Sequence, residues 1–302
     1  MTHSDPGDQF VQREDKAVYE TQEPVLYAVA DGVATLTMNR PDFHNVQNSP
    51  MTYALDACFR QAVDDDTVKV IVLRGAGKHF SAGHDIGSPG RDINKPFDRQ
   101  TLWWDHTNKP GAEQLFAREQ EVYLGMCRRW HDIHKPTIAM VQGACVAGGL
   151  MLAWVCDLII ASDDAFFQDP VVRMGIPGVE YFAHAHELNP RIAKEFLFLG
   201  ERMKADRAYM MGMVNRVVPR DELETQTYDI AARIAKQPRM GLALKKTVIN
   251  RVEELQGLRT TMDVAFGYHH FAHAHSQVLG AGQLGGHDAK TMAQANKKDA
   301  KE

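Results

Sequence analysis

The chain has 302 residues, of which 44% are hydrophobic and 24% are charged, values that are ordinary for a folded globular protein. Its formal net charge of -5 argues against a nucleic-acid surface, which would need a basic stripe or patch. The four cysteines show no C-x-x-C or zinc-type spacing, and the first residues contain no apolar run that resembles a signal peptide. We therefore expect a cytoplasmic protein with reduced thiols that binds neither nucleic acid nor membrane.

The beginning of the chain predicts an extension followed by a hairpin. Residues 1–22 are polar and acidic without periodicity, so we expect a polar N-terminal extension. Two β-rich runs, 25–30 and 33–38, are separated by an Asp-Gly pair. That dipeptide is the strongest short signal for a tight hairpin turn. The globular part is therefore expected to begin at about residue 23.

The next 140 or so residues alternate between helical and strand patterns, with the spacing of βαβ units. The run at 68–73 has little polar alternation, which is typical of a strand covered on both faces. Residues 87–110 are rich in Gly, Pro, Asp and Asn and predict a loop that acts as a lid. The expected elements are a helix at 49–63, a strand at 68–73, a helix at 113–134, a strand at 137–141, an apolar helix at 144–156 and a strand at 157–161.

From about residue 191 the pattern becomes helical. The apolar positions predict helices at 192–199, 205–211, 222–236 and 242–255, and residues 276–302 form a Gly-rich and then Ala/Lys-rich tail. The apolar segment 144–156 has no charge, but thirteen residues are too few to span a bilayer. We therefore expect a mainly parallel α/β core followed by a helical region.

A serine, two histidines and an aspartate crowd the stretch KHFSAGHDI at 78–86. A catalytic triad is defined by side chains that converge in space, and near neighbours on an extended segment leave on opposite faces. No G-x-S-x-G turn surrounds Ser81. The sequence therefore argues against a serine nucleophile.

Two stretches share a different feature, a small-residue turn placed between a strand and a helical segment. They are SAGHD at 81–85 and GACVAGGLMLA at 143–153. The first N–H groups of a helix have no intrahelical acceptor, and glycine lets a ligand atom approach the backbone closely. A Gly pair at a helix start alone is more often close packing. Together, however, two converging N–H groups would hold a negatively charged oxygen.

Several motifs in consistent order resemble the crotonase (enoyl-CoA hydratase/isomerase) family. They are NRPDFHNV at 39–46, VIVLRGAGKHFSAGHDI at 70–86, KPTIAMVQGACVAGGLMLAWVCDLIIAS at 135–162, MGIPG at 174–178 and ADRAYMMGMVNRVVP at 205–219. The resemblance implies an α/β fold, the ClpP/crotonase-like spiral of ββα units over 23–220. It further implies a C-terminal helical trimerisation region and tail over 221–302, and a homotrimer or dimer of trimers.

The resemblance also implies an acyl-CoA thioester as substrate, with no metal and no cofactor other than the coenzyme A of the substrate. The backbone amides of His84 and Gly148 take the oxyanion-hole positions of the family. Phe271 takes the position of an aromatic residue at the adenosine, although a buried core aromatic is an equal alternative. The other residues expected along the substrate are Phe43, His44, Val46, Lys78, Phe80, Ala82, Asp85 and Ile86.

One part of the family pattern is missing. Hydratases of this family use two glutamates to activate water, and their positions fall on Met151 and Val171, neither of which can accept a proton. Asp169 and Glu180 are substitute bases, although Asp169 can be a turn former before Pro170 and Glu180 an exposed or ion-paired carboxylate. Further candidates are Tyr181, His184 and Glu187.

Three functions therefore remain open. An enoyl-CoA hydratase-like lyase comes first, and double-bond isomerisation or other enolate chemistry with Asp169 or Glu180 is the alternative. A catalytically silent acyl-CoA binding protein is the second alternative. A zinc site at His269 and His273, four residues apart on a predicted helix beside His270 and His275, is a less favoured reading, because short histidine motifs often arise by chance.

Overall fold

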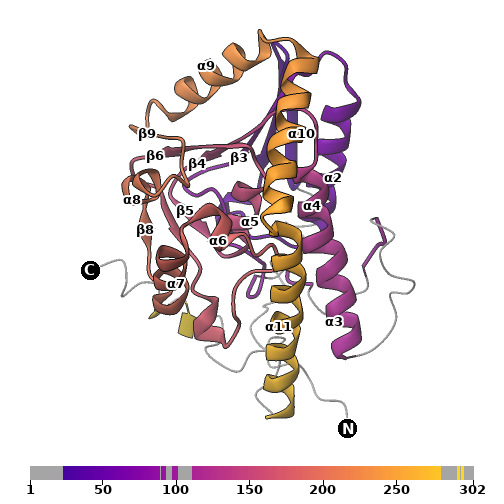
Figure 1. The fold of residues 1–302 in the computed structure, drawn as a ribbon, viewed down its shortest axis with the longest axis vertical. Helices are drawn as coiled ribbons and strands as arrows, with labels where there is room; N and C mark the ends of the chain where they lie inside the picture. The colour runs from indigo at the N-terminus through magenta and orange to yellow at the C-terminus, as the bar shows by residue number, and fades with distance from the viewer. Residues whose placement is uncertain are drawn as a thin grey trace.

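The main sheet has six strands in the order β1-β2-β3-β4-β6-β9 (Figure 1). A computed structural model describes residues 23–88, 90–92, 97–100, 111–279, 291–292 and 294–295. All neighbouring strands are parallel except β1 and β2, which form the predicted hairpin. The strands are β1 (Val25–Ala30), β2 (Val33–Met38), β3 (Val70–Gly75), β4 (Thr137–Val141), β6 (Leu158–Ser162) and β9 (Arg216–Val218).

A second, smaller sheet contains β5 (Ala144–Val146), β7 (Phe166–Gln168) and β8 (Met203–Lys204). The prediction that the helix extends back to residue 144 is therefore wrong, because its first three residues pair with β7 as a strand, whereas the prediction that Gly148-Gly149 opens the helix is confirmed. Ala147 then adopts φ 49° and ψ -117°, which turns the chain into α5 (Gly148–Trp154). Such a backbone conformation costs an alanine about 1–3 kcal/mol and is often found at functional sites.

Helices cover both faces of the main sheet. One face packs against α9 (Leu223–Ala235), through side chains that include Val70, Val72 and Ile138. The other face carries the larger core, to which α2 (Ser49–Asp64) and α5 contribute. Burial on both faces confirms the prediction for the β3 region and explains its lack of polar alternation.

The predicted helix at 113–134 is interrupted. It comprises α3 (Ala112–Glu119), the π-helix η4 (Gln120–Gly125) and α4 (Met126–His131). Five of the six residues of η4 are buried. Because π-turns are uncommon and concentrate at functional sites, this segment directs attention to the side chains that it places inward.

The C-terminal region is helical as predicted. In Figure 1, α10 (Arg239–Leu255) and α11 (Leu258–Val278) follow one another along the side of the molecule next to α2, α4 and α3. The remaining short elements are η3 (Pro41–Phe43), η5 (Val171–Met174), α6 (His184–Glu187), α7 (Pro190–Leu199) and α8 (Ala205–Met210). The predicted extension 1–22, much of the predicted lid and most of the tail lie outside the described residues.

Two further findings concern the environment of the chain. In the described part of the chain, no helix is long and apolar enough to cross a membrane. All four cysteines are buried and free, and burial raises the pKa of the Cys127 and Cys145 thiols well above its ordinary value. Thiols in that state are poor nucleophiles and metal ligands, so the cysteines are core residues.

Candidate functional site

The stretch around Ser81 lies between two other segments. On one side, Ala82 N–H donates to His44 O at 2.9 Å. Farther along the same side, Gln47 N–H donates to Gly83 O at 2.8 Å and Gln47 O accepts from Asp85 N–H at 2.8 Å. The predicted substrate-binding segments 43–46 and 78–82 are therefore brought together by backbone hydrogen bonds.

The other side of this stretch faces β5. Ser81 N–H donates to Ala144 O at 3.1 Å, and Val146 N–H donates to Ser81 O at 3.0 Å. The Ser81 hydroxyl is itself buried and donates to Asn45 O at 2.9 Å. Its bonds hold the backbone in place, which supports the prediction that Ser81 is not a nucleophile.

The direction of the His84 N–H follows from these bonds. In a planar trans peptide the C=O and the N–H point in opposite directions. Because Gly83 O points to Gln47, the N–H of His84 points away from Gln47, towards the side occupied by β5 and the start of α5. Among the described residues, His84 N–H has no backbone acceptor.

The Gly148-Gly149 pair brings the second N–H to the same place. A Cβ on Gly83 would lie 3.1 Å from Gly148 N, so the two segments touch. A Cβ on Gly149 would lie 2.5 Å from Ser81 O, and one on Gly148 would lie 2.7 Å from His84 Cε1. Gly149 is therefore required for the close approach of α5 to the 81–85 stretch, and Gly148 leaves room for the His84 ring. Gly148 N–H, in the first turn of the helix, has no intrahelical acceptor.

The imidazole of His84 is held in a defined position beside Gly148. Its Nε2 lies 2.9 Å from Glu180 Oε2, and its ring stacks on Tyr123 with centroids 3.8 Å apart and an interplanar angle of 21°. The Glu180 residue is 3% exposed. Of the two alternatives to a base, the structure excludes an exposed Glu180 and agrees with an ion-paired one.

The protonation of this pair can be assigned from its surroundings. Burial alone would raise the pKa of Glu180, but the attraction to His84, the hydrogen bond with it and the charge of His269 bring the pKa below its ordinary value. An ionised carboxylate only accepts hydrogen bonds, so the N–H at His84 Nε2 donates to Glu180 Oε2. His84 Nδ1 is buried and makes no hydrogen bond to the described residues, and it lies 2.8 Å from the position of a Cβ on Gly148.

Tyr123, in the π-helix η4, stacks on one face of the His84 ring. Arg118 is buried against it, with Nη1 3.4 Å from the Tyr123 hydroxyl and Nη2 donating to Ser49 Oγ at 2.7 Å and to Asp92 Oδ1 at 3.1 Å. Burial raises the pKa of Tyr123, so its phenol stays neutral. Sequence reasoning missed Tyr123, because a π-helical turn leaves no pattern in the residues, and Arg118, because its partners Ser49 and Asp92 are distant in the sequence.

Asp169, the other predicted base, lies in a closed pair. Its Oδ2 is 2.7 Å from His184 Nε2, both side chains are 0% exposed, and Asp169 Oδ1 accepts from Val171 N–H at 3.3 Å. The ring of His184 lies against those of Trp154 and Phe182. This position favours a structural role for both residues.

Replacing Asp169 by alanine is expected to cost about 3–5 kcal/mol of unfolding free energy, because it leaves His184 buried without its partner. Asp169→Asn keeps the shape and is expected to cost less. In both variants, kcat of the folded protein should remain within about threefold of wild type, far from the roughly 10²-fold loss of a missing base. Urea unfolding and steady-state kinetics on the same preparations test this. A stable Asp169→Asn with kcat reduced by roughly 10²-fold or more would instead make Asp169 the base.

The remaining predicted residues fall into three groups. Asp85 and Phe80 are buried, and Asp85 pairs with Arg40 at 2.9 Å and with Ser88, so its role is to hold the loop. Phe271 is 71% exposed, so the core-aromatic alternative is wrong within one subunit. The residues that are exposed or partly exposed, as substrate contacts would be, are Phe43, His44, Val46, Lys78, Ala82 and Ile86.

Met151 and Val171, at the positions of the two missing glutamates, also lie among apolar side chains. Met151 is fully buried in the core, and Val171 packs in a small cluster that also contains Ile86 and Ile176. Of the further candidates, Tyr181 lies near His131 with ring centroids 6.4 Å apart, and burial raises the pKa of Glu187 to about 8. The His84 and Glu180 pair is thus the acid/base pair that the described residues place beside the two N–H donors.

The chain is similar to known proteins along most of its length. The chain matches the family model described as enoyl-CoA hydratase/isomerase over residues 28–286. EchA13 of Mycobacterium tuberculosis, whose name assigns it provisionally as an enoyl-CoA hydratase, is 42% identical over 262 residues, covering 85% of this chain and 82% of its own. The 1,2-epoxyphenylacetyl-CoA isomerase of Escherichia coli is 31% identical over 256 residues, covering 83% and 90%.

A solved structure of a probable enoyl-CoA hydratase from Mycobacterium smegmatis is also similar. Its sequence is 42% identical, its TM-score is 0.78, and the match covers 87% of this chain and 99% of that chain. The similarity thus extends through the fold as well as through the motifs.

Proposed function

The chain belongs to the enoyl-CoA hydratase/isomerase (crotonase) family, and from this premise we propose that it forms an enolate of an acyl-CoA thioester between the backbone N–H groups of His84 and Gly148. The observation that carries the proposal is the contact of the Gly83-His84 peptide with the start of α5, beside the buried pair of His84 and Glu180. Each N–H donor aimed at a developing oxyanion contributes roughly 10²- to 10³-fold in rate.

His84 Nδ1 is the proposed general base, and Glu180 is the residue that orients it. With its proton on Nε2 and directed at Glu180, the imidazole presents the lone pair of Nδ1 near Gly148. This division of roles, in which an acid fixes the tautomer of a histidine, is used by catalytic triads on unrelated folds. The base would remove a proton from a carbon next to the thioester or conjugated with it, and the electron pair would pass to the thioester oxygen.

Double-bond isomerisation suits a site with a single acid/base pair. The proton that His84 accepts from one carbon returns to another carbon of the same enolate. The reaction therefore requires neither water nor a second carboxylate. Addition of water needs a second group to hold and activate the water, and Met151 and Val171 cannot provide one. We therefore place isomerisation or related enolate chemistry first.

Hydration is the second candidate, supported by the names of the two mycobacterial relatives. In that case Glu180 and His84 together would have to position the water. Both reactions share the enolate and differ in what is added to it, which makes them separable by product analysis.

One assay on the purified protein separates the alternatives. Saturated, 2-enoyl and 3-enoyl CoA esters of several chain lengths are incubated in D₂O, and products are followed by NMR and mass spectrometry. We expect exchange of protons next to the thioester and conversion of 3-enoyl to 2-enoyl esters, with slower or no hydration. Tight CoA-ester binding without exchange or turnover on any of them would indicate a binding protein and contradict the proposal.

We further infer a homotrimer or a dimer of trimers, supported by exposed apolar residues on the two C-terminal helices. A monomer rarely leaves a large contiguous apolar surface in water. The exposed apolar residues on α10 and α11 include Leu244, Val248, Val252, Leu255, Val264, Tyr268 and Phe271. The four reduced, buried cysteines support the expected cytoplasmic location.

A further inference from the structure

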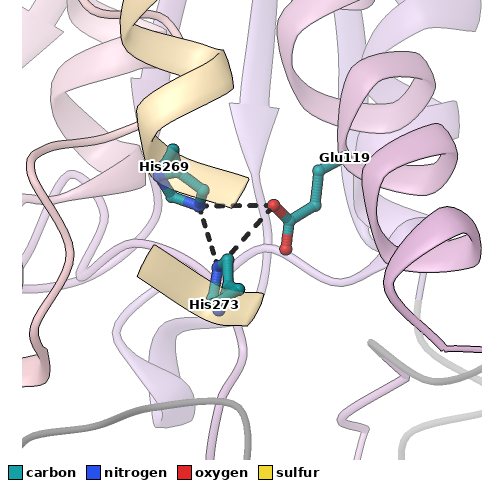
Figure 2. A group of neighbouring side chains, drawn as sticks. All are labelled: Glu119, His269 and His273. Carbon is teal, nitrogen blue, oxygen red and sulfur yellow. Dashed lines mark hydrogen bonds and ion pairs between the residues drawn. The ribbon is translucent and has the colours of Figure 1, made fainter. Parts of the chain in front are cut away.

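We propose that Glu119, His269 and His273 form a binding site for a Zn²⁺ ion. In Figure 2, the two histidines project from adjacent turns of α11 towards the glutamate at the end of α3, and the three side chains converge on one point. All three residues are buried. Two imidazoles and one carboxylate are a ligand set that zinc commonly takes in proteins.

The distances between the ligand atoms fit a single ion. His269 Nε2 and His273 Nε2 are 3.0 Å apart, His269 Nε2 and Glu119 Oε2 are 3.3 Å apart, and His273 Nε2 and Glu119 Oε2 are 4.0 Å apart. A triangle with these sides has a centre about 2.0 Å from every corner, close to the Zn–N and Zn–O bond lengths of about 2.0–2.2 Å. A small movement of the side chains is enough to complete the coordination, with a fourth position left for water.

The outer contacts also suit a metal site. His269 Nδ1 lies 2.9 Å from Gly178 O, which can only accept, so Nδ1 carries a proton and Nε2 is the atom that faces the centre of the cluster, where an ion would take the place of its proton. A metal-ligating histidine almost always donates its other N–H to a carbonyl or carboxylate in this way. His270 Nε2 approaches Glu119 Oε2 at 3.2 Å and would hold the carboxylate from outside the coordination sphere.

Without an ion, the cluster is poorly satisfied. Glu119 Oε2 and His270 Nε2 are both buried, and neither makes an aligned hydrogen bond to the described residues, although they face one another. Glu119 Oε2 is held by ion pairs with His269 Nε2 at 3.3 Å and His270 Nε2 at 3.2 Å, so its charge is balanced but its hydrogen-bond geometry is poor. A Zn²⁺ ion would satisfy Oε2 directly.

The location gives the ion a structural task. It would join α11 to α3, which continues into the π-helix carrying Tyr123, and through His269 it would hold Gly178, two residues before Glu180. The ion would therefore fix the parts that support the His84 ring. This departs from the expectation, drawn from the family resemblance, that no metal is needed.

Metal analysis of the untagged full-length protein tests the proposal. After growth with added zinc and purification without chelators, we expect about one zinc per chain by elemental mass spectrometry. Zinc returned to the chelator-treated protein should raise Tm by about 5 °C or more at a large excess over Kd. Co²⁺ bound in its place should give the visible absorption of a tetrahedral site.

Matched variants on the same helix decide whether these residues are the ligands. His273→Gln should lose the zinc and the Tm response, whereas His275→Gln, at an exposed position two residues away, should keep both. Zinc-free protein that shows no Tm response to Zn²⁺ would contradict the proposal, and so would equal metal content in both variants. The wild-type titration decides the question if His273→Gln does not fold, and neither measurement depends on the activity of the enzyme.

Discussion

Replacing Glu180 by glutamine is expected to lower kcat by roughly 10²- to 10⁴-fold, with little effect on the affinity for an acyl-CoA. The amide keeps the size of the carboxylate, but it no longer holds the proton on His84 Nε2 by charge, so the lone pair on Nδ1 is lost for part of the time. His84→Gln, which removes the imidazole but keeps the backbone N–H, should lose a similar factor. The measurement is steady-state turnover on the best substrate, with binding of a saturated acyl-CoA measured separately.

The double variant His84→Gln/Glu180→Gln gives a sharper result. Because an orienting acid and its base act as a unit, the double variant should be no slower than the worse single variant. Glu195 forms an exposed ion pair with Arg207 and has no part in the proposed chemistry. Glu195→Gln is therefore the matched control and should keep wild-type kcat. If Glu180→Gln turns over within threefold of wild type, the assignment of this pair is wrong.

Gly148→Ala is expected to fold and to lose roughly 10²- to 10³-fold in kcat/KM. The added Cβ would lie 2.7 Å from His84 Cε1 and 2.8 Å from His84 Nδ1, so the ring has to leave the place where it meets the substrate. The clash is with a side chain rather than with backbone, but moving the ring also separates His84 from the buried Glu180, so some stability should be lost as well. Circular dichroism, urea unfolding and kinetics on one preparation separate the two effects.

Two other glycines are controls for this substitution. In Gly149→Ala the Cβ would lie 2.5 Å from the backbone oxygen of Ser81. That oxygen cannot shift without displacing the strand paired with it, so we expect the variant to be less stable. In Gly241→Ala, within α10, no atom lies within 4 Å of the new Cβ, so stability and activity should be kept or improved. A fully active Gly148→Ala would contradict the role of this position.

The sequence predicted the parts of the fold that depend on local pattern. The Asp-Gly hairpin, the doubly covered β3 and the C-terminal helices follow from turn chemistry and apolar periodicity. The short strand β5 was missed because Ala144–Val146 is three residues long and runs directly into a helix of similar apolar character. The bend at Ala147 has no signal in the residue type, since glycine is the residue normally found in that conformation.

The candidate site could be predicted only where motifs carry it. The GG pair and the SAGHD turn pointed to His84 and Gly148, but the pairing of His84 with Glu180 joins residues 96 positions apart and depends on the tertiary fold. The inward position of Tyr123 depends on the π-helix η4, whose extra residue per turn no helical spacing rule predicts. Only part of the cluster of Glu119, His269 and His273 could be predicted. The two histidines are four residues apart and so share a helix face, but Glu119 is 150 residues before His269 and comes from another helix.

The most direct test is a crystal structure of the protein with a non-reacting saturated acyl-CoA. We expect the thioester oxygen within about 3.1 Å of both His84 N and Gly148 N, with the carbon next to the carbonyl facing His84 Nδ1. A thioester oxygen that meets only water, or side chains elsewhere in the molecule, would contradict the central claim that these two backbone groups bind one oxygen.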